Sequence, residues 1–266
     1  MLHPGSTHID LEAVLAHFAE HGYARLGPVL ADAAAEQLRQ RANALMLGEV
    51  RIPGLFFQHD SPTGQYEDLV FGAGWVGPSL SYRKLEKLEL DPLFAAWVAN
   101  PLFGRIAREL LGEDIALYRT VLWNKAAHTG MDLPWHQDDG QFWGLDRAPR
   151  LQIWTALDDA PAEAGCLEVV PGSHLAGLAS PIGGTVQPNR LEETRALARS
   201  VAIPVAAREA LLIHNHVWHR SGRNTTDAPR RAIGISYLSA ATRCRRKKSA
   251  PREFQRIFPD ETGAAL

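Results

Sequence analysis

The sequence predicts a mainly β chain with helices at its N-terminal end. Helical periodicity dominates the first 110 residues or so, and from Ile115 onward short β-compatible runs alternate with Gly, Pro and Asp. No internal repeat or low-complexity linker divides the 266 residues. We therefore predict a double-stranded β-helix, a jelly-roll or cupin-like core, with the N-terminal helices packed outside it.

Three helices are predicted from spacing and capping signals. The first follows Asp10, which can cap it, and ends at Gly22. Its apolar residues recur at helical spacing at Leu11, Val14, Leu15 and Phe18. The second covers Ala31 to about Leu45, and the third follows Asn100, has Pro101 in its first turn and stops at Gly112. The apolar stripe of the third helix is Leu102, Ile106 and Leu110.

The β-compatible runs divide the rest of the chain. Six of them are typical of strands: 116–123, 151–157, 166–170, 200–205, 210–214 and 233–238. Segment 177–199, with a helical part at 191–198, is interpreted as an insertion between barrel strands and a candidate lid. Segment 52–77 contains several glycines and is a second candidate, expected to close over a binding pocket of the barrel. The predicted organisation is one domain, with a helical part at 1–113, a barrel core at 114–240 and a C-terminal extension at 241–266.

Composition is that of a compact enzyme. The chain is 45% hydrophobic and 22% charged with a formal net charge of −2, which gives no general attraction to nucleic acid. The basic run at 243–248 is interpreted as a solvated segment, with a rim that attracts an anionic substrate as the alternative. Cys166 and Cys244 lack the spacing of a disulfide framework or zinc site. With no signal segment and no apolar run of about eighteen residues, we expect a cytoplasmic protein with no membrane partner.

A metal motif stands at His136-Gln137-Asp138. Side chains at i and i+2 of a strand share a face, so His136 and Asp138 can reach one ion while Gln137 points the opposite way. One further histidine would complete the facial triad of non-haem Fe(II) oxygenases, with open positions for cosubstrate and dioxygen. Alone the motif is weak, and a surface loop near Pro134 is the alternative interpretation. The candidate third ligands are His214, His216 and His219, and spacing does not choose between them.

An ordered set of motifs resembles the phytanoyl-CoA dioxygenase family of Fe(II)/2-oxoglutarate oxygenases. The distal element is His219-x-Ser221-x-x-Asn224, followed by Arg230 eleven residues beyond the histidine. The other matching segments are Leu122-Trp123-Asn124-Lys125, Trp135-His136-Gln137-Asp138, Trp154-Thr155-Ala156-Leu157-Asp158 and Gly165-Cys166-Leu167-Glu168-Val169-Val170-Pro171-Gly172-Ser173-His174. The resemblance spans about half the chain, roughly 120 to 240, so substrate choice is poorly covered.

The resemblance implies roles for individual residues. It implies that His136, Asp138 and His219 bind Fe(II), with 2-oxoglutarate and dioxygen as cosubstrates. It implies that Arg230 takes the distal carboxylate of 2-oxoglutarate, because a guanidinium can hold a carboxylate with two hydrogen bonds. The implied helpers are Asn124 and Ser221, with Trp154 as a pocket wall. Arg231 is the alternative anchor; only one of the two arginines should face the interior, and the eleven-residue offset favours Arg230.

For several other residues, a structural role is weighed against a functional one. His174 is expected to order a loop, and His214 and His216 to be barrel or pocket residues. Lys84 is expected to be a solvated lysine on a helix or loop, with a pocket role as the alternative. For three aromatic residues, cavity lining and plain packing are equally favoured: Trp135, Phe142 and Trp143.

The predicted function is oxidation of a small metabolite. Related halogenases have a small residue where Asp138 stands, so the carboxylate favours oxygenation, as hydroxylation, desaturation or oxidative cyclisation. The Ala/Arg-rich composition favours a natural-product tailoring step, such as one on an oligosaccharide antibiotic or an amino-acid-derived intermediate. The alternatives are a cupin-like metalloenzyme without 2-oxoglutarate and a non-catalytic small-molecule-binding barrel. The sequence specifies neither the substrate nor the oligomeric state.

Overall fold

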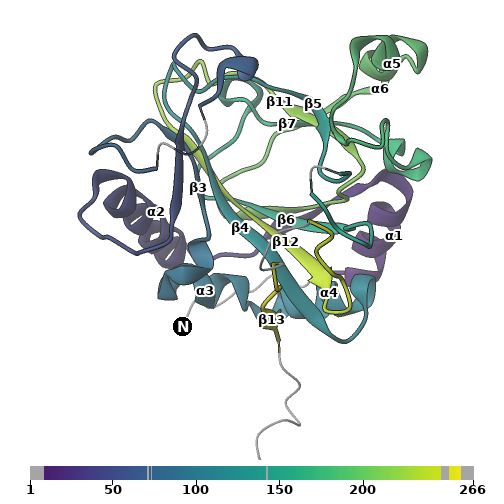
Figure 1. Ribbon diagram of the computed structural model, residues 1–266, viewed down its shortest axis with the longest axis horizontal. Coiled ribbons are helices and arrows are strands. Elements are labelled where there is room, and N and C mark those ends of the chain that lie inside the picture. The colour runs from purple at the N-terminus through teal and green to yellow at the C-terminus, as the bar shows by residue number, and fades with distance from the viewer. Residues whose placement is uncertain (1–8, 71, 73, 142, 247–251, 259–266) are drawn as a thin grey trace, which may run out of the picture.

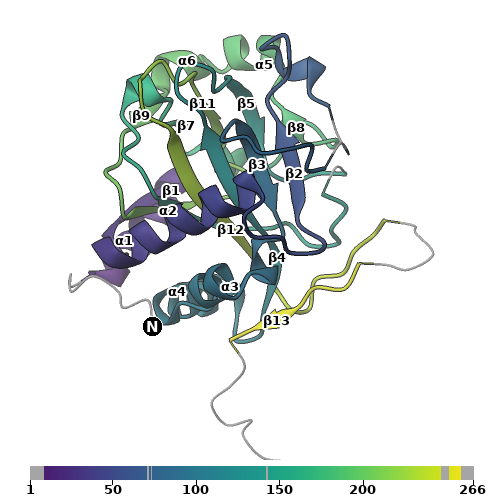
Figure 2. The same cartoon turned by 90° about the vertical axis from the view of Figure 1, so that its left-hand side faces the viewer.

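Two antiparallel sheets face each other, and helices cover the outer side of the larger one (Figures 1 and 2). The computed structural model describes residues 9–70, 72, 74–141, 143–246 and 252–258. The larger sheet has the order β1 (Tyr23–Pro28), β10 (Glu209–Ile213), β6 (Leu151–Ala156), β12 (Arg230–Ser239), β4 (Ile115–Lys125), β3 (Tyr82–Glu86) and β2 (Phe56–His59), and β13 (Arg256–Ile257) pairs with β4. The smaller sheet has the order β8 (Gly184–Thr185), β5 (Leu133–Gln137), β11 (Trp218–Ser221), β7 (Leu167–Val170) and β9 (Val201–Ile203). The predicted double-stranded β-helix is confirmed.

The three predicted helices are confirmed as α1 (Leu11–His21), α2 (Asp32–Leu47) and α4 (Pro101–Leu111). Asp10 caps α1 by accepting a hydrogen bond from the amide of Ala13 at 3.1 Å. A further helix, α3 (Pro92–Val98), was not predicted, since its seven residues are too few to show periodicity. Its signal was the cap, because Asp91 accepts from the amide of Leu93 at 2.8 Å. No helix in the described part of the chain has the length and apolar character needed to cross a membrane.

The six predicted strand runs correspond to β4, β6, β7, β9, β10 and β12. The part expected to be helical, at about 1–113, also supplies β1, β2 and β3 to the larger sheet. Their short segments carry little pattern of their own and are defined by pairing with distant strands: Tyr23 lies opposite Ile213, and Lys84 opposite Trp123. The predicted helix at 191–198 is also corrected. It is split into α5 (Pro188–Glu193) and α6 (Ala196–Arg199) by Arg195, whose φ is 49°.

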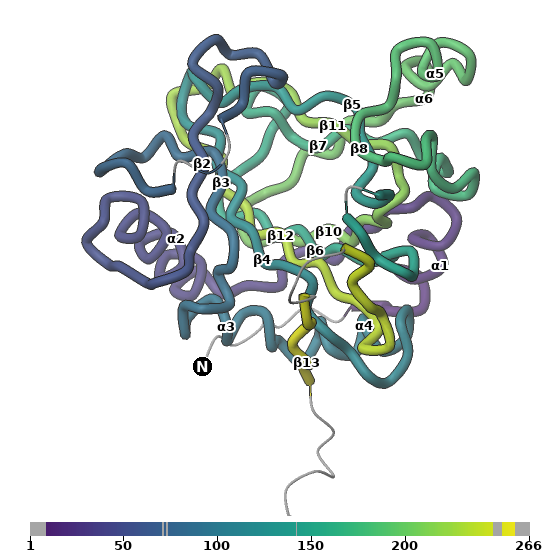
Figure 3. Tube along the Cα trace, viewed as in Figure 1, coloured from purple at the N-terminus to yellow at the C-terminus, as the bar shows by residue number. Residues whose placement is uncertain are grey.

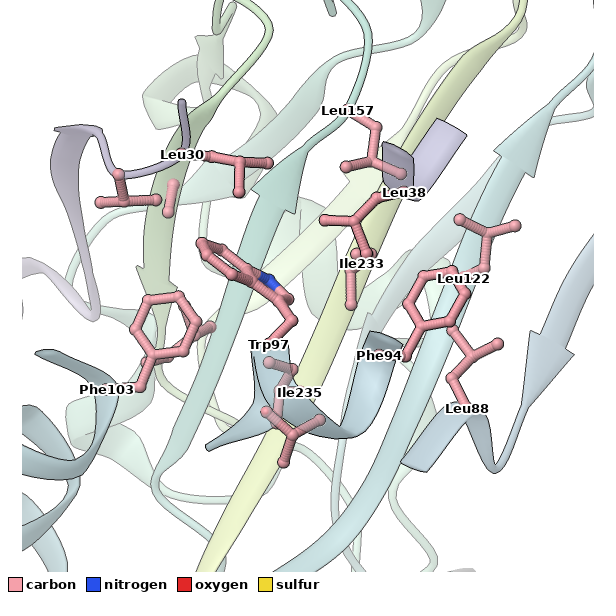
Figure 4. Packing of buried hydrophobic residues seen from close by; sticks show 14 of the residues in the cluster. Leu30, Leu38, Leu88, Phe94, Trp97, Phe103, Leu122, Leu157, Ile233 and Ile235 are labelled. Atoms are coloured by element: carbon pink, nitrogen blue, oxygen red, sulfur yellow. The ribbon is translucent and has the colours of Figure 1, made fainter. Parts of the chain in front are cut away.

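The larger sheet is buried on both faces. Its outer face packs against α1 to α4, and Figure 4 shows Phe94, Trp97 and Phe103 of the helices beside Ile233 and Ile235 of β12. Its inner face packs against the smaller sheet through a second apolar cluster that includes Val169, Leu211 and Ala232. All six residues of β6 are therefore buried, so burial along this strand is continuous and does not alternate from one residue to the next.

The segment after Gly177 covers the outer face of the smaller sheet. Its strand β8 pairs with β5, with Thr185 opposite His136. Its buried residues Val186 and Ala196 pack against Trp135 and Trp218. This segment is thus packed onto the back of the sheet that carries the metal motif.

Two loops approach closely at one end of the smaller sheet, where Gly165 precedes β7 and Gly222 follows β11. Gly165 has a φ of 73°, and a Cβ placed on it would lie 2.1 Å from the carbonyl oxygen of Gly222. Both the backbone conformation and the contact therefore require glycine. Gly27 offers a comparison, since its φ is 71° but a Cβ there would meet nothing within 4 Å.

We expect Gly165→Ala to lower the free energy of unfolding by about 3 kcal/mol and Gly27→Ala by about 1 kcal/mol, because only the first adds a backbone collision to the cost of a positive φ. Urea denaturation followed by circular dichroism measures both values. Equal losses for the two variants would show that the contact with Gly222 does not constrain the fold.

Candidate active site

The three predicted metal ligands meet between two paired strands. His136 on β5 lies directly opposite His219 on β11, and Figure 3 shows these chain segments side by side although more than eighty residues separate them. Asp138 follows the end of β5. One donor atom from each of the three side chains lies within 4.8 Å of the others. Nε2 of His219 is 3.7 Å from a carboxylate oxygen of Asp138.

Backbone carbonyls orient both imidazoles in the same way. Nδ1 of His136 lies 2.8 Å from the carbonyl oxygen of Pro134, and Nδ1 of His219 lies 2.9 Å from that of Val217. Each Nδ1 therefore carries the proton and donates to its carbonyl. The lone pair of each Nε2 remains available to a metal, an arrangement usual for metal-binding histidines.

The protonation states also suit a metal. Burial lowers the pKa of His136, and the neighbouring His219 lowers it further, so the imidazole is neutral at physiological pH. Burial alone would raise the pKa of Asp138, but the charge of Arg119 and the two imidazoles outweigh it and the pKa falls. Gln152 donates to the other side of this carboxylate at 2.7 Å. Two imidazoles and one carboxylate are the donor set that a ferrous ion takes in the facial triad, so the residues fit that metal.

A cavity opens between the sheets beside the triad. Both sheets and the segment before β3 line it, including Asp60, Trp123, Lys125, Trp154, Ser221 and Arg230. Asp60 belongs to segment 52–77, which was expected to close over this pocket. The predicted wall Trp154 and helper Ser221 both line the cavity.

Arg230 and Arg231 point to opposite faces of β12, as the alternation of a strand requires. Arg230 lines the cavity and is 3% exposed, and among the described residues no hydrogen-bond partner meets its Nε. Burial lowers its pKa to about 10, so the guanidinium is charged at neutral pH. Arg231 is held on the outer face by Asp158, with nitrogen–oxygen distances of 2.7 and 2.8 Å, and by Asn43. The cavity therefore contains the arginine that the offset favours.

Asn124 is among the residues that line the cavity. Its cross-strand neighbour is Arg231, and its Nδ2 donates to the backbone carbonyls of Leu80 and Tyr82. Both donor hydrogens are thus used by backbone carbonyls, and a role for Asn124 as a helper of Arg230 stays a prediction. The next residue, Lys125, lies opposite Arg230, lines the cavity, and donates from Nζ to the carbonyl of Met131.

Lys125 is the residue that sequence reasoning missed. The signal was the two-residue period of a strand: if Arg230 faces inward, its cross-strand partner does too. Burial lowers the pKa of Lys125 well below its usual value, and the charge of Arg230 lowers it further. The amine of Lys125 thus lies next to Arg230 in the same buried cavity.

The remaining candidates lie outside the triad. His216 pairs with Asp139 at 2.7 Å, and His214 accepts a hydrogen bond from the backbone amide of His216 at its Nδ1. His174 contacts the carbonyl oxygen of Ala19 through Nε2, at 3.1 Å, and so ties its loop to α1 as expected.

Two aromatic candidates and one lysine make packing or ion-pair contacts. Trp135 packs on the outer face of the smaller sheet, and Trp143 stacks on Tyr118 with 4.2 Å between the ring centroids. Phe142 lies outside the described residues. Lys84 is not solvated as expected: it lies on strand β3, its side chain is 12% exposed, and its Nζ is 2.8 Å from a carboxylate oxygen of Glu86.

Comparison with known proteins agrees with this geometry. The model of the family described as phytanoyl-CoA dioxygenase matches residues 18–232, well over half of the chain. The chain belongs to the phytanoyl-CoA dioxygenase family. A curated relative, phytanoyl-CoA dioxygenase domain-containing protein 1 of Bos taurus, is 30% identical over 159 residues, which cover 57% of this chain and 55% of the relative. The match thus spans about half the length of that relative.

Two further comparisons concern a curated hydroxylase and a solved structure. L-proline trans-4-hydroxylase of Streptomyces griseoviridis is 36% identical over 106 residues, 38% of each chain. The crystal structure of the epimerase SnoN, in complex with Fe3+, alpha ketoglutarate and nogalamycin RO, superposes with a TM-score of 0.70 at 20% identity. The superposition covers 94% of this chain and 96% of that one and shows a shared fold.

Replacing His136, Asp138 or His219 by Ala should weaken Fe(II) binding by more than about 100-fold, since even losing an outer partner of a metal ligand costs 10- to 100-fold. Anaerobic titration with Fe(II) measures the affinity. His214→Ala and His216→Ala are the controls and should bind one iron like the wild type. If His219→Ala kept its iron and either control lost it, the distal ligand would be misassigned.

Proposed function

We propose that the protein is an Fe(II)- and 2-oxoglutarate-dependent oxygenase that oxidises a small metabolite. The observation that carries the proposal is Arg230: a buried guanidinium without a carboxylate partner among the described residues, in the same cavity as the triad. Bound iron would supply dioxygen activation, with electrons from 2-oxoglutarate as it loses carbon dioxide and becomes succinate. The rest of the chemistry depends on how this chain's residues hold the two organic molecules.

The cavity suits a dicarboxylic acid. An unpaired buried charge is costly, so Arg230 favours a ligand that brings a carboxylate to it. Lys125, opposite it on β4, adds a second hydrogen-bond donor at the same end, and the hydroxyl of Ser221 lines the same space. The ring of Trp154, 5.6 Å from the guanidinium carbon of Arg230, forms a wall that limits water. A ligand anchored there would present its other end to the triad.

Both alternatives explain less. A cupin-like metalloenzyme that does not use 2-oxoglutarate has no need of a buried, unpaired arginine beside its metal. A non-catalytic binding barrel has no need of two imidazoles with Nδ1 fixed by carbonyls and a carboxylate beside them.

We propose a natural-product tailoring step as the cellular role. The named relatives support small substrates: one is a hydroxylase of L-proline, and the SnoN structure holds nogalamycin RO. The proposed reaction is hydroxylation, desaturation or oxidative cyclisation, on a substrate such as an oligosaccharide antibiotic or an amino-acid-derived intermediate. The two isolated cysteines favour a cytoplasmic location. Mass spectrometry of candidate metabolites, coupled to measurement of succinate release, tests the assignment; no succinate from any Fe(II)-loaded reaction would contradict it.

Arg230→Ala should raise the dissociation constant for 2-oxoglutarate roughly 30-fold to several thousand-fold, because losing a buried charged pair costs about 2–5 kcal/mol. Isothermal titration of the anaerobic Fe(II)-loaded protein measures it, and iron binding should be nearly unchanged.

Arg231→Ala is the matched control for that variant. It breaks the ion pair with Asp158 on the outer face, so it should lower thermal stability while 2-oxoglutarate affinity stays within about threefold of wild type. A larger loss of affinity in Arg231→Ala than in Arg230→Ala would reverse the assignment of the anchor.

The reaction type has a separate test, since Asp138 fills the position that a halide would need. With chloride or bromide in excess, the native protein should give oxidised products without halogen, and Asp138→Gly should lose oxygenation. Product masses from the metabolite screen show the outcome. A chlorinated product from the native protein would overturn the oxygenase assignment.

A further inference from the structure

Arg119 borders the triad on the side away from Arg230. Its Nη2 is 3.5 Å from a carboxylate oxygen of Asp138. On β4 it precedes Lys125 by six residues, about 20 Å along an extended strand, and Lys125 lies opposite Arg230. The metal ligands therefore lie between the end of the cavity that contains Arg230 and Lys125 and the side chain of Arg119.

The guanidinium of Arg119 is held by aromatic rings more than by acids. Its carbon lies 4.6 Å from the ring centroid of Trp143, a distance typical of a cation–π contact. Its two acidic contacts are long: 3.5 Å to Asp138 and 3.8 Å to Glu86. Charge-assisted hydrogen bonds from arginine are usually 2.7–2.9 Å, so the fork of this side chain is not filled by the described residues. The side chain is only 17% exposed.

Both acids beside Arg119 have other partners. Glu86 accepts from Lys84 at 2.8 Å, a closer contact than its 3.8 Å to Arg119. Burial would raise the pKa of Glu86, but Lys84, Arg119 and then Arg252 outweigh it and lower that pKa. Lys84 and Arg119 thus share Glu86, and the charge of Asp138, the other acid beside Arg119, would be shared with a metal.

We propose that the primary substrate carries an anionic group, a carboxylate or a phosphate, and that Arg119 binds it beside the triad. This inference rests on the proposed function and adds the substrate class to it. The planar fork above Trp143 suits an anion of two or three oxygens. An anchor here would hold the substrate on the opposite side of the metal from 2-oxoglutarate.

A second role for Arg119 would be to position Asp138 alone. That role predicts an effect on iron affinity but no preference among substrates. The substrate role predicts a preference for acids over their neutral analogues that depends on the guanidinium. The two can be separated on the protein loaded anaerobically with Fe(II) and saturating 2-oxoglutarate, which fills the Arg230 end of the cavity.

The experiment compares matched acidic and neutral probes by isothermal titration. The pairs are L-proline and L-prolinamide, N-benzoylglycine and its amide, and glycerol 3-phosphate and glycerol; the last pair separates phosphate from carboxylate. We expect at least one acid to bind more tightly than its neutral partner. Arg119→Gln should weaken that acid roughly 10- to 100-fold, with little effect on the neutral partner and with iron content unchanged. Arg119→Lys, which keeps the charge without the fork, should lose less.

Arg105→Gln is the matched control, because it removes an exposed cation from α4 on the outer side of the larger sheet. It should keep the acid preference in full. Equal or undetectable binding of acids and neutral partners to the wild type would overturn the inference, as would an acid preference that survives in Arg119→Gln. Loss of iron in Arg119→Gln with an unaltered preference in Arg119→Lys would assign the residue to Asp138 and also overturn it. A wild-type protein that does not bind 2-oxoglutarate would instead contradict the proposed function.

Discussion

The pairing of β5 with β11 is the constraint on which the site depends. It places His136 directly opposite His219, and the carbonyls of Pro134 and Val217 turn the two rings so that the same nitrogen of each is available. Each carbonyl lies two residues before its histidine, so the local backbone at β5 and at the start of β11 supplies both orienting bonds. Any slip of one residue in this register would turn one imidazole to the opposite face and separate the ligands.

The surroundings of β5 fix that register. Gln137 points away from the cavity and uses its amide for three contacts, with the carbonyls of Gly177 and His216 and the amide of Ala179. The segment after Gly177 then covers the back of the sheet, and β8 pairs with the free edge of β5. Gln137, between two metal ligands, thus helps to hold β5 in place, and the segment after Gly177 supports the same strand from the back of the sheet.

The larger sheet contributes charge, and the smaller sheet contributes the metal ligands. β4 and β12 carry Lys125 and Arg230 at one end of the cavity, and Arg119 of β4 lies 3.5 Å from the metal ligand Asp138. Because the outer face of this sheet is packed against helices, these cations project from a rigid, largely apolar layer. Buried cations without acids cost stability in the absence of ligands, a cost that binding sites for anions commonly carry.

The sequence by itself determined the fold class, the three longer helices and the chemical nature of the site. Those features depend on local signals: capping residues, the periods of helices and strands, and the motifs around His136, His219 and Arg230.

Tertiary structure decided the rest. β1, β2 and β3 form because distant strands offer them partners, and α3 is too short to show a period. Spacing could not choose among His214, His216 and His219, and the pairing of β11 with β5 places only His219 opposite His136. Asn124 and Lys125 are adjacent in the matching motif, and only the register of β4 against β12 shows which of them shares a face with Arg230. The reason is that side chains alternate along a strand, so the face a residue occupies is defined by its neighbours across the sheet.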